Sequence, residues 1–369
     1  MRIETVAEKP ILTNLQALRG IAALMVCSYH FSYLIQAPWG AIVFSHGWLG
    51  VQIFFIISGF IMVHTTAKIK TDHVKGARTF IINRIIRVVP IYYLCTFLMI
   101  APNLNDGYLI EHGRRLICSL LFISPMNASI GPEYGMPSLV PGWSLNYEML
   151  FYALFAISIL TRNLKYTFLY SVFIAAIFVI PLLTTGKFPA SYQTYVPYHF
   201  NYLNVLTNPV LVHFLFGITL GLVMPKISTT RNVKVIAMIL ATILFLAYIT
   251  GLAGIPFHIW NDLLYCGLLV FAFLLNDYGN NGIRFKPVMV KIGDMSYSIY
   301  LLHTIVIIYL KIAMHKIGIG GLIPTTGFFL FAILVVIAVS YIFYLFVEKK
   351  LTQYLKSKFA SQTKITTPS

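Results

Sequence analysis

Residues 48–66 read WLGVQIFFIISGFIMVHTT, a run without a single Asp, Glu, Lys or Arg. A helix that crosses the hydrocarbon core of a bilayer needs roughly 20 predominantly apolar residues. Similar runs recur along the 369-residue chain, which is 58% hydrophobic and only 10% charged. A soluble domain carries about 25% charged residues. The composition therefore predicts a protein that crosses a membrane several times.

The apolar runs predict an all-α polytopic membrane bundle of about ten transmembrane helices, at residues 15–35, 48–66, 86–102, 143–161, 166–183, 209–224, 235–251, 259–276, 292–314 and 324–347. The segment near 114–142 has too short an apolar part to cross and is rich in Pro and Gly. We expect a re-entrant or interfacial element there, because irregular backbone at membrane depth needs shelter. Residues 1–350 are interpreted as one membrane-embedded domain and 351–369 as a short polar cytoplasmic tail.

The net charge is +16, from 27 Lys and Arg against 11 Asp and Glu. In a soluble protein this excess would favour nucleic-acid binding, but so apolar a chain leaves no soluble domain that could present a basic face. Cytoplasmic loops of membrane proteins are rich in Lys and Arg. With the N-terminus inside, most of the cations fall on the cytoplasmic side, and ten spans return the C-terminus to that side. We therefore expect both termini in the cytoplasm and no nucleic-acid partner.

The first predicted span carries two ionisable side chains, Arg19 and His30. Such residues within a membrane are costly and indicate function. Eleven residues of helix put both on one face, roughly 16 Å apart. This suits a substrate with an anionic part at Arg19 and a reactive end at His30. An Arg that reaches to the interface and a His that bonds to a neighbouring helix would explain the pattern as well.

Arg84 and Arg87 stand at the predicted cytoplasmic start of the third span. Their i, i+3 spacing places both on one helix face, and guanidinium groups suit bidentate phosphate recognition. The alternative is that they only mark the cytoplasmic side.

The run PGWSLNYEMLFY at 141–152 places Glu148 inside an otherwise apolar helix, where a carboxylate needs an Arg or His partner. A structural ion pair is the alternative. In the run GDMSYSIYLLH at 293–303, Ser296, Tyr300 and His303 share one helical stripe, which interhelical packing could explain equally.

A guanidinium cluster, a deeper histidine and a carboxylate fit a transferase in which the histidine acts as general base or is transiently acylated. They fit a proton-coupled secondary transporter equally well. A non-catalytic membrane component of polysaccharide assembly is a third possibility. The chain contains no metal-binding or dinucleotide-binding fingerprint, so we expect no metal.

Five blocks taken together resemble the integral-membrane acyltransferase family 3. They are LQALRGIAALMVCSYHF from residue 15, GVQIFFIISGFIM from 50, RIIRVVPIYYL from 84, PGWSLNYEMLFY from 141 and GDMSYSIYLLH from 293. Their order and spacing match that family, in the branch that acylates exopolysaccharide or O-antigen. The resemblance implies a multi-pass protein of the bacterial inner membrane that moves an acyl group from cytoplasmic acyl-CoA, usually acetyl-CoA, to a hydroxyl of a cell-surface polysaccharide or its lipid-linked precursor.

The resemblance also distributes roles among the candidate residues. Its essential positions fall on Arg19, His30, Arg84, Arg87, Trp143, Glu148, Ser296 and Tyr297. We expect acyl-CoA to bind at Arg19, Arg84 and Arg87, and catalysis at His30 with Glu148, which would orient or charge His30 or hold the acceptor. Supporting positions are Trp143, Ser144, Ser296, Tyr297 and His303. The expected partners are acyl-CoA, a carbohydrate acceptor and the lipid bilayer.

Overall fold

The computed structural model describes residues 12–69, 71–104, 106–125, 130–188, 191–192, 198, 201–279 and 281–365. All regular elements within these ranges are helices. Nine helical stretches in the described part are long and apolar enough to cross a membrane: Pro38–Thr66, His73–Asn103, Gly142–Leu160, Arg162–Thr185, Pro209–Lys226, Arg231–Ile249, Ile259–Asp277, Ser296–Lys316 and Thr326–Phe359. The predicted all-α, multi-pass class is confirmed, and each stretch contains most of one predicted span.

The first predicted span forms helix α1 (Thr13–Phe31), which is not among these nine apolar stretches. Polar side chains such as Asn14, Gln16 and Arg19 lower its hydropathy. It packs against α3 (Leu49–Thr66), α12 (Ile259–Asp277), α13 (Pro287–Asp294) and α14 (Ser296–Lys316). Other helices therefore surround α1, which reduces the cost of its polar groups.

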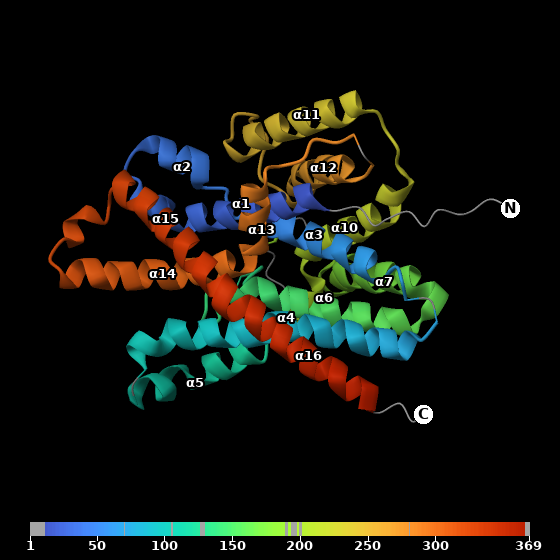
Figure 1. Cartoon of the computed structure of the whole chain (residues 1–369), viewed down its shortest axis with the longest axis horizontal. Helices are drawn as coiled ribbons and strands as arrows, with labels where there is room; N and C mark the ends of the chain where they lie inside the picture. Colours follow the sequence, from blue (N-terminus) through green and yellow to red (C-terminus); the bar gives the residue numbers. More distant parts are fainter. Residues whose placement is uncertain are drawn as a thin grey trace.

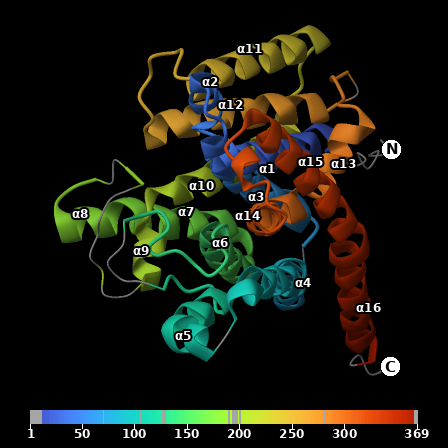
Figure 2. The same cartoon turned by 90° about the vertical axis from the view of Figure 1, so that its left-hand side faces the viewer.

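The helices lie side by side, with α11 (Arg231–Ile249) and α12 along one edge and α4 (His73–Ile100) and α5 (Asp106–Leu120) along the other (Figures 1 and 2). The start of α1 and the end of α16 (Lys349–Ile365) point towards the same end of the bundle (Figure 1). Their cytoplasmic location stays a prediction.

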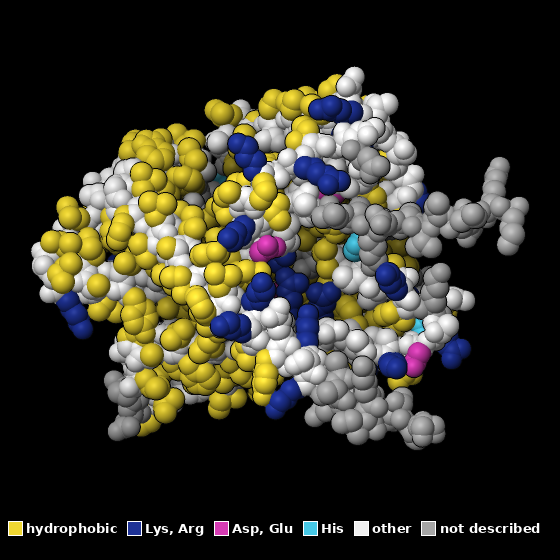
Figure 3. Space-filling model, viewed as in Figure 1, with side chains coloured by type: hydrophobic (Ala, Val, Ile, Leu, Met, Phe, Trp, Pro, Cys, Tyr) yellow, Lys and Arg dark blue, Asp and Glu magenta, His cyan; other side chains and the backbone are white. Residues whose placement is uncertain are grey.

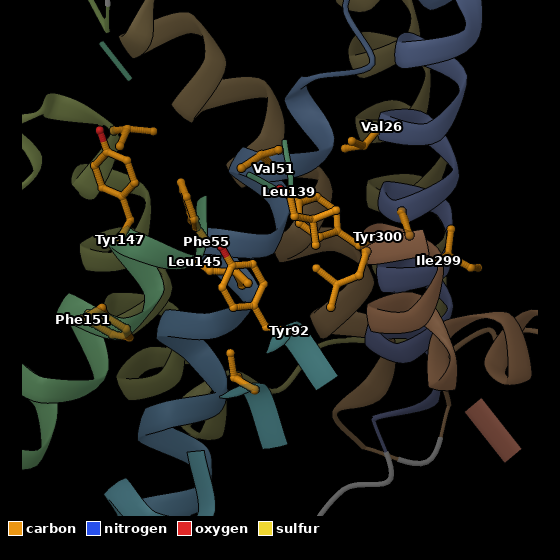
Figure 4. Close-up of a cluster of buried hydrophobic side chains, with 14 of the residues drawn as sticks. Val26, Val51, Phe55, Tyr92, Leu139, Leu145, Tyr147, Phe151, Ile299 and Tyr300 are labelled. Carbon is orange, nitrogen blue, oxygen red and sulfur yellow. The ribbon is translucent and has the colours of Figure 1, made fainter. Parts of the chain in front are cut away.

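The core is built around α3 and its neighbours. Figure 4 shows part of a buried cluster to which α1, α3, α4, α6 (Gly142–Leu160) and α14 contribute side chains. Helix α3 packs most extensively against α10 (Val212–Val223). A Cβ on Gly217 would lie 2.0 Å from the Ile56 carbonyl oxygen, and one on Gly59 would lie 2.2 Å from that of Phe214. Small residues at this crossing allow the two backbones to touch.

The third predicted span begins earlier than expected. Helix α4 starts at His73, where the Asp72 side chain accepts a hydrogen bond of 2.9 Å from the Lys75 backbone N–H. Arg84 therefore lies about three turns inside the helix and Arg87 about four. The apolar run on which the predicted span was based is only part of a longer helix, which a polar cap begins well before it. The position of the arginines at the cytoplasmic start of the membrane span stays a prediction.

The ninth predicted span is two helices, α13 and α14, separated at Met295. Gly293 at the end of α13 crosses α1 so closely that a Cβ there would lie 1.8 Å from the Gln16 carbonyl oxygen. The break thus occurs where one helix presses on another, directly before Ser296.

Two further segments are more regular than expected. Helix α15 (Thr326–Phe343) continues through the π-helical turn Tyr344–Glu348 into α16, so the predicted polar tail is helical up to Ile365. Residues 366–369 lie outside the described part. Within the segment 114–142, the end of α5 is helical and Arg115 ties it to the following loop, donating to the carbonyl oxygens of Met136 at 2.8 Å and Pro137 at 2.9 Å. Residues 126–129 of that segment are outside the described part.

Candidate active site

Two adjoining cavities lie within the bundle. We call the first the arginine chamber; it measures about 110 Å³ and includes Arg19, Arg84 and Arg87 in its lining. We call the second the histidine chamber; it measures about 320 Å³ and includes His30. Val51 of α3 and Tyr300 of α14 line both cavities, and Figure 4 draws these two side chains in the core. The structure thus brings residues of distant sequence blocks to two adjoining compartments.

Arg84 is the most constrained cation of the arginine chamber. It is only 9% exposed, and its Nη2 donates a hydrogen bond of 3.3 Å to Thr65. Its guanidinium carbon lies 5.5 Å from the centre of the Phe80 ring and 5.6 Å from that of the Tyr152 ring. Its Nε has no hydrogen-bond partner in the described part of the chain. Arg84 is therefore held in place by packing, with donor capacity left over.

Two glutamates share this region with the arginines. Glu148 lines the chamber and accepts hydrogen bonds from Ser58, at 3.0 Å, and from Tyr152. Glu348 is buried and accepts a hydrogen bond of 2.5 Å from Ser298. Both carboxylates interact electrostatically with Arg19.

The arginines are not paired directly with these carboxylates. Among the described residues, no carboxylate oxygen lies within 4.0 Å of Arg19, Arg84 or Arg87. Arg19 donates instead to Gln16 at 3.0 Å. Three cations against two anions leave a positive excess in a sheltered space, and free guanidinium donors favour an anionic ligand. Figure 3 shows Lys and Arg side chains gathered near the centre of one face, where α3, α4, α13 and α16 meet in Figure 1.

His30 stands near the end of α1 and has a histidine neighbour. Its Nδ1 lies 2.9 Å from the Val26 carbonyl oxygen and 3.3 Å from Nε2 of His303. His303 is fully buried, and its own Nδ1 lies 3.2 Å from the Ile299 carbonyl oxygen. Both backbone carbonyls can only accept, which assigns a proton to Nδ1 of each ring. Nε2 of His30 is then left with a lone pair, the form that a general base requires.

The rest of the histidine chamber combines rings with a few polar groups. Trp48, Trp143 and Tyr192 contribute aromatic surface. Gln52 is buried, and its Oε1 has no hydrogen-bond partner among the described residues. Glu133, in the loop before α6, also lines this space, and burial raises the pKa of its carboxyl above the usual range. Apolar walls with a few placed polar groups are typical of pockets for small organic ligands.

The boundary between the chambers is held by hydroxyl groups. The hydroxyl oxygens of Ser144 and Tyr300 lie 2.6 Å apart, so one donates to the other, and each lies 3.1 Å from the Pro141 carbonyl oxygen. Tyr297 donates to the Val88 carbonyl oxygen of α4 at 2.9 Å. Ser296 is fully buried beside the arginine chamber, and its Oγ has no partner in the described ranges. These bonds fix the positions of α4, α6 and α14 around the site.

The structure thus brings all ten predicted site residues to the two chambers or directly behind them. Glu148 lines the arginine chamber, and the polar side chain beside His30 is His303. The expected action of Glu148 on His30 or on the acceptor stays a prediction. Sequence reasoning missed Glu348 and Glu133. Glu348 directly follows the last predicted span, where a carboxylate at the edge of an apolar run could have been noticed. Glu133 lies in an irregular loop with no periodic signal.

Taken together, the fold and the site define a polytopic membrane protein in which a chamber lined by three arginines adjoins a chamber lined by His30. The sequence model of acyltransferase family 3, described as an acyltransferase domain, matches residues 12–345. The chain belongs to this family, so the family resemblance is confirmed and the protein is a multi-pass membrane acyltransferase.

Several characterised proteins are similar to the chain. The exopolysaccharide production protein ExoZ of Rhizobium meliloti is 32% identical over 291 residues, covering 77% of this chain and 84% of ExoZ. The acyltransferase MdmB of Streptomyces mycarofaciens is 27% identical over 332 residues, covering 81% of this chain and 79% of MdmB. The O-acetyltransferase OatA of Staphylococcus aureus is 22% identical over 340 residues, and the match spans only 53% of OatA. No solved structure matches the chain.

Proposed function

We propose that the protein transfers an acyl group, in the first instance acetyl, from cytoplasmic acyl-CoA to a hydroxyl of a cell-surface polysaccharide or its lipid-linked precursor. The bacterial inner membrane is the proposed location. The observation that carries this proposal is the shared wall of Val51 and Tyr300 between a chamber with three arginines and a chamber with His30. The names of ExoZ and OatA, which refer to exopolysaccharide and to O-acetyl transfer, support the choice of acceptor and group.

The donor would occupy the arginine chamber. CoA is polyanionic, and Arg19, Arg84 and Arg87 offer guanidinium forks that match phosphate geometry. Arg19 and His30 are separated by eleven residues of the same helix, a rise of roughly 16 Å. An extended pantetheine arm can bridge this distance. Phosphates held at the arginines would therefore deliver the thioester to the wall near Tyr300.

His30 would act as the base. Its Nε2 takes the proton of the acceptor hydroxyl while the sugar oxygen attacks the thioester carbonyl carbon. The tetrahedral intermediate then collapses, the carbon–sulfur bond breaks, and His30 returns the proton to the departing CoA sulfur. The alternative, in which Nε2 itself is acylated first, uses the same lone pair. His303 would be a positioning residue that holds the ring of His30 in the required tautomer.

Glu148 would act on the donor side. Its carboxylate accepts a hydrogen bond from Tyr152, and the Tyr152 ring packs against Arg84. We propose that Glu148 balances the charge of the arginine chamber and, through Tyr152, orients Arg84. Ser296 and Tyr297 would shape the same chamber, and Trp143 would contribute to the acceptor side.

The test uses the purified protein in proteoliposomes with radiolabelled acetyl-CoA and chemically deacylated polysaccharide from a strain that lacks the gene. We expect label in the polysaccharide, one acetyl group per repeat by NMR, and loss of both in His30→Ala. A folded His30→Ala protein with full activity would remove His30 from the mechanism. Flux of a solute without release of CoA would favour a transporter instead.

A further inference from the structure

A third cavity adjoins the arginine chamber, between the end of α3 and the first turns of α4. We call it the lysine groove; it measures about 390 Å³, and its lining includes Thr65, Asp72, Lys75, Thr79, Asn83 and Arg84. Arg84 also lines the arginine chamber, and its Nη2 donates to Thr65 in the groove at 3.3 Å. The end of α3 and the start of α4 lie at the end of the bundle towards which the start of α1 and the end of α16 point (Figure 1). The two cavities therefore meet at Arg84.

The arginine chamber is too small for the whole of the proposed donor. It measures about 110 Å³, whereas pockets that enclose a drug-sized ligand measure roughly 300–1,000 Å³, and CoA is a nucleotide with a long pantetheine arm. If the arm runs from the arginines towards His30, the nucleotide end extends away from His30, beyond the arginines. The lysine groove is the larger cavity that begins there, at Arg84.

A stripe of polar side chains runs along α4 in this groove. Lys75, Thr79 and Asn83 follow one another at intervals of four residues, which places them one above another on the same helix face. The stripe is about 12 Å long and ends directly beside Arg84. All three side chains are exposed, so they can contact a ligand without any change in the packing of the bundle.

The charge of the groove favours an anionic ligand. Lys75 has no carboxylate oxygen within 4.0 Å in the described part of the chain. The carboxylate in the lining, that of Asp72, accepts the hydrogen bond of 2.9 Å from the Lys75 backbone N–H that caps α4. Lys165 adds a cation at the edge, where its Nζ donates to Thr66 of the lining at 2.6 Å. Together with Arg84, three cations stand against one anion.

We propose that the lysine groove binds the 3′-phosphoadenosine end of the acyl donor, with the 3′-phosphate at Lys75 and the edge of the adenine at Asn83. This inference rests on the proposed function, because it concerns the donor of that reaction. An ammonium group binds phosphate as a point charge, and a carboxamide can pair with the donor and acceptor on one edge of adenine. Arg84 stands where the groove meets the chamber and binds the diphosphate. The protein thus selects CoA over a thioester that carries pantetheine alone.

The experiment compares three acyl donors in proteoliposomes with deacylated polysaccharide: acetyl-CoA, acetyl-3′-dephospho-CoA and S-acetylpantetheine. We expect Lys75→Ala to raise the KM for acetyl-CoA about fivefold, the size of an exposed ion pair, and to leave the KM for acetyl-3′-dephospho-CoA unchanged. Asn83→Ala should lower kcat/KM for both nucleotide donors and leave that for S-acetylpantetheine unchanged. Lys68→Ala is the matched control, because it removes an exposed cation of the same segment that is not in the lining of the groove.

Calorimetric binding of CoA and 3′-dephospho-CoA to the purified protein separates this subsite from the proposed function. If CoA binds more tightly than 3′-dephospho-CoA and Lys75→Ala removes that difference while Lys68→Ala keeps it, the subsite stands even if no acetyl transfer is detected. Equal affinity of the unaltered protein for both compounds would overturn the subsite, whether or not transfer occurs. So would an equal loss of affinity for both compounds in Lys75→Ala, which would indicate that Lys75 only supports the start of α4.

Discussion

Replacement of Arg84 by alanine is the most direct test of the proposal that acyl-CoA binds in the arginine chamber. Arg84 is packed between the rings of Phe80 and Tyr152, and it keeps a free Nε beside the cavity. The substitution removes one of three cations while Glu148 and Glu348 remain, so the positive excess of the chamber disappears. Because Arg84 lies on the donor side of the Val51–Tyr300 wall, the acceptor site should be unaffected.

The expected size of the effect follows from the bond that is lost. A hydrogen bond to a charged partner contributes about 1.5–3 kcal/mol, and each 1.4 kcal/mol is about a factor of ten in affinity. Arg84→Ala should therefore raise the KM for acetyl-CoA by roughly 10- to 100-fold. Arg84→Lys keeps the positive charge but loses the planar guanidinium group that can bind a phosphate through two hydrogen bonds. We therefore expect its KM for acetyl-CoA to lie between those of the unaltered protein and Arg84→Ala.

The assay measures release of the CoA thiol while the concentration of acetyl-CoA is varied and deacylated polysaccharide is saturating. A second series varies the polysaccharide at saturating acetyl-CoA. Lys68→Ala, which removes an exposed cation outside the chamber, is the matched control and should change neither KM. The phosphate role of Arg84 would be refuted by a folded Arg84→Ala protein with an unchanged KM for acetyl-CoA. An equal rise in both KM values would point to a general distortion of the bundle.

Three further predictions concern other parts of the molecule. His303→Ala should lower kcat by about ten- to a hundredfold and leave the KM for acetyl-CoA unchanged, because it disturbs the tautomer of His30 and not the arginine chamber; a normal kcat would remove the positioning role. Burial raises the pKa of the Glu133 carboxyl, so this group takes up a proton at a higher pH than an ordinary glutamate does. If the acceptor binds to the carboxylate, the KM for the acceptor should rise as the pH falls through that raised pKa. A Glu133→Gln protein should lose this pH dependence. Gly217→Ala should destabilise the bundle by about 1–3 kcal/mol, since the new Cβ would meet the Ile56 carbonyl oxygen at 2.0 Å; Gly113→Ala, with nothing within 4 Å, is the control in thermal unfolding in detergent.

Much of the fold could be predicted from the sequence because a bilayer imposes a simple length rule on apolar helices. The predicted positions of nine spans correspond to the nine apolar helical stretches in the described part of the chain. The errors fall where polar residues lie within helices. Helix α4 begins at His73 because Asp72 caps it, and the helix break at Met295 coincides with the close crossing of Gly293 over α1. Neither the start of α4 nor the break at Met295 can be predicted from the hydropathy of the sequence.

By itself, the sequence determined that the chain is a membrane bundle, and it singled out the costly polar residues, such as Arg19, His30 and Glu148, as candidates for the site. It did so because an ionisable group within a membrane span costs so much free energy that such residues are rare, and they can be recognised in the linear sequence. Only the tertiary structure decided how those groups divide between chambers. Glu148 joins the arginines and His303 joins His30 because helix packing, which depends on contacts between distant segments, sets which faces meet.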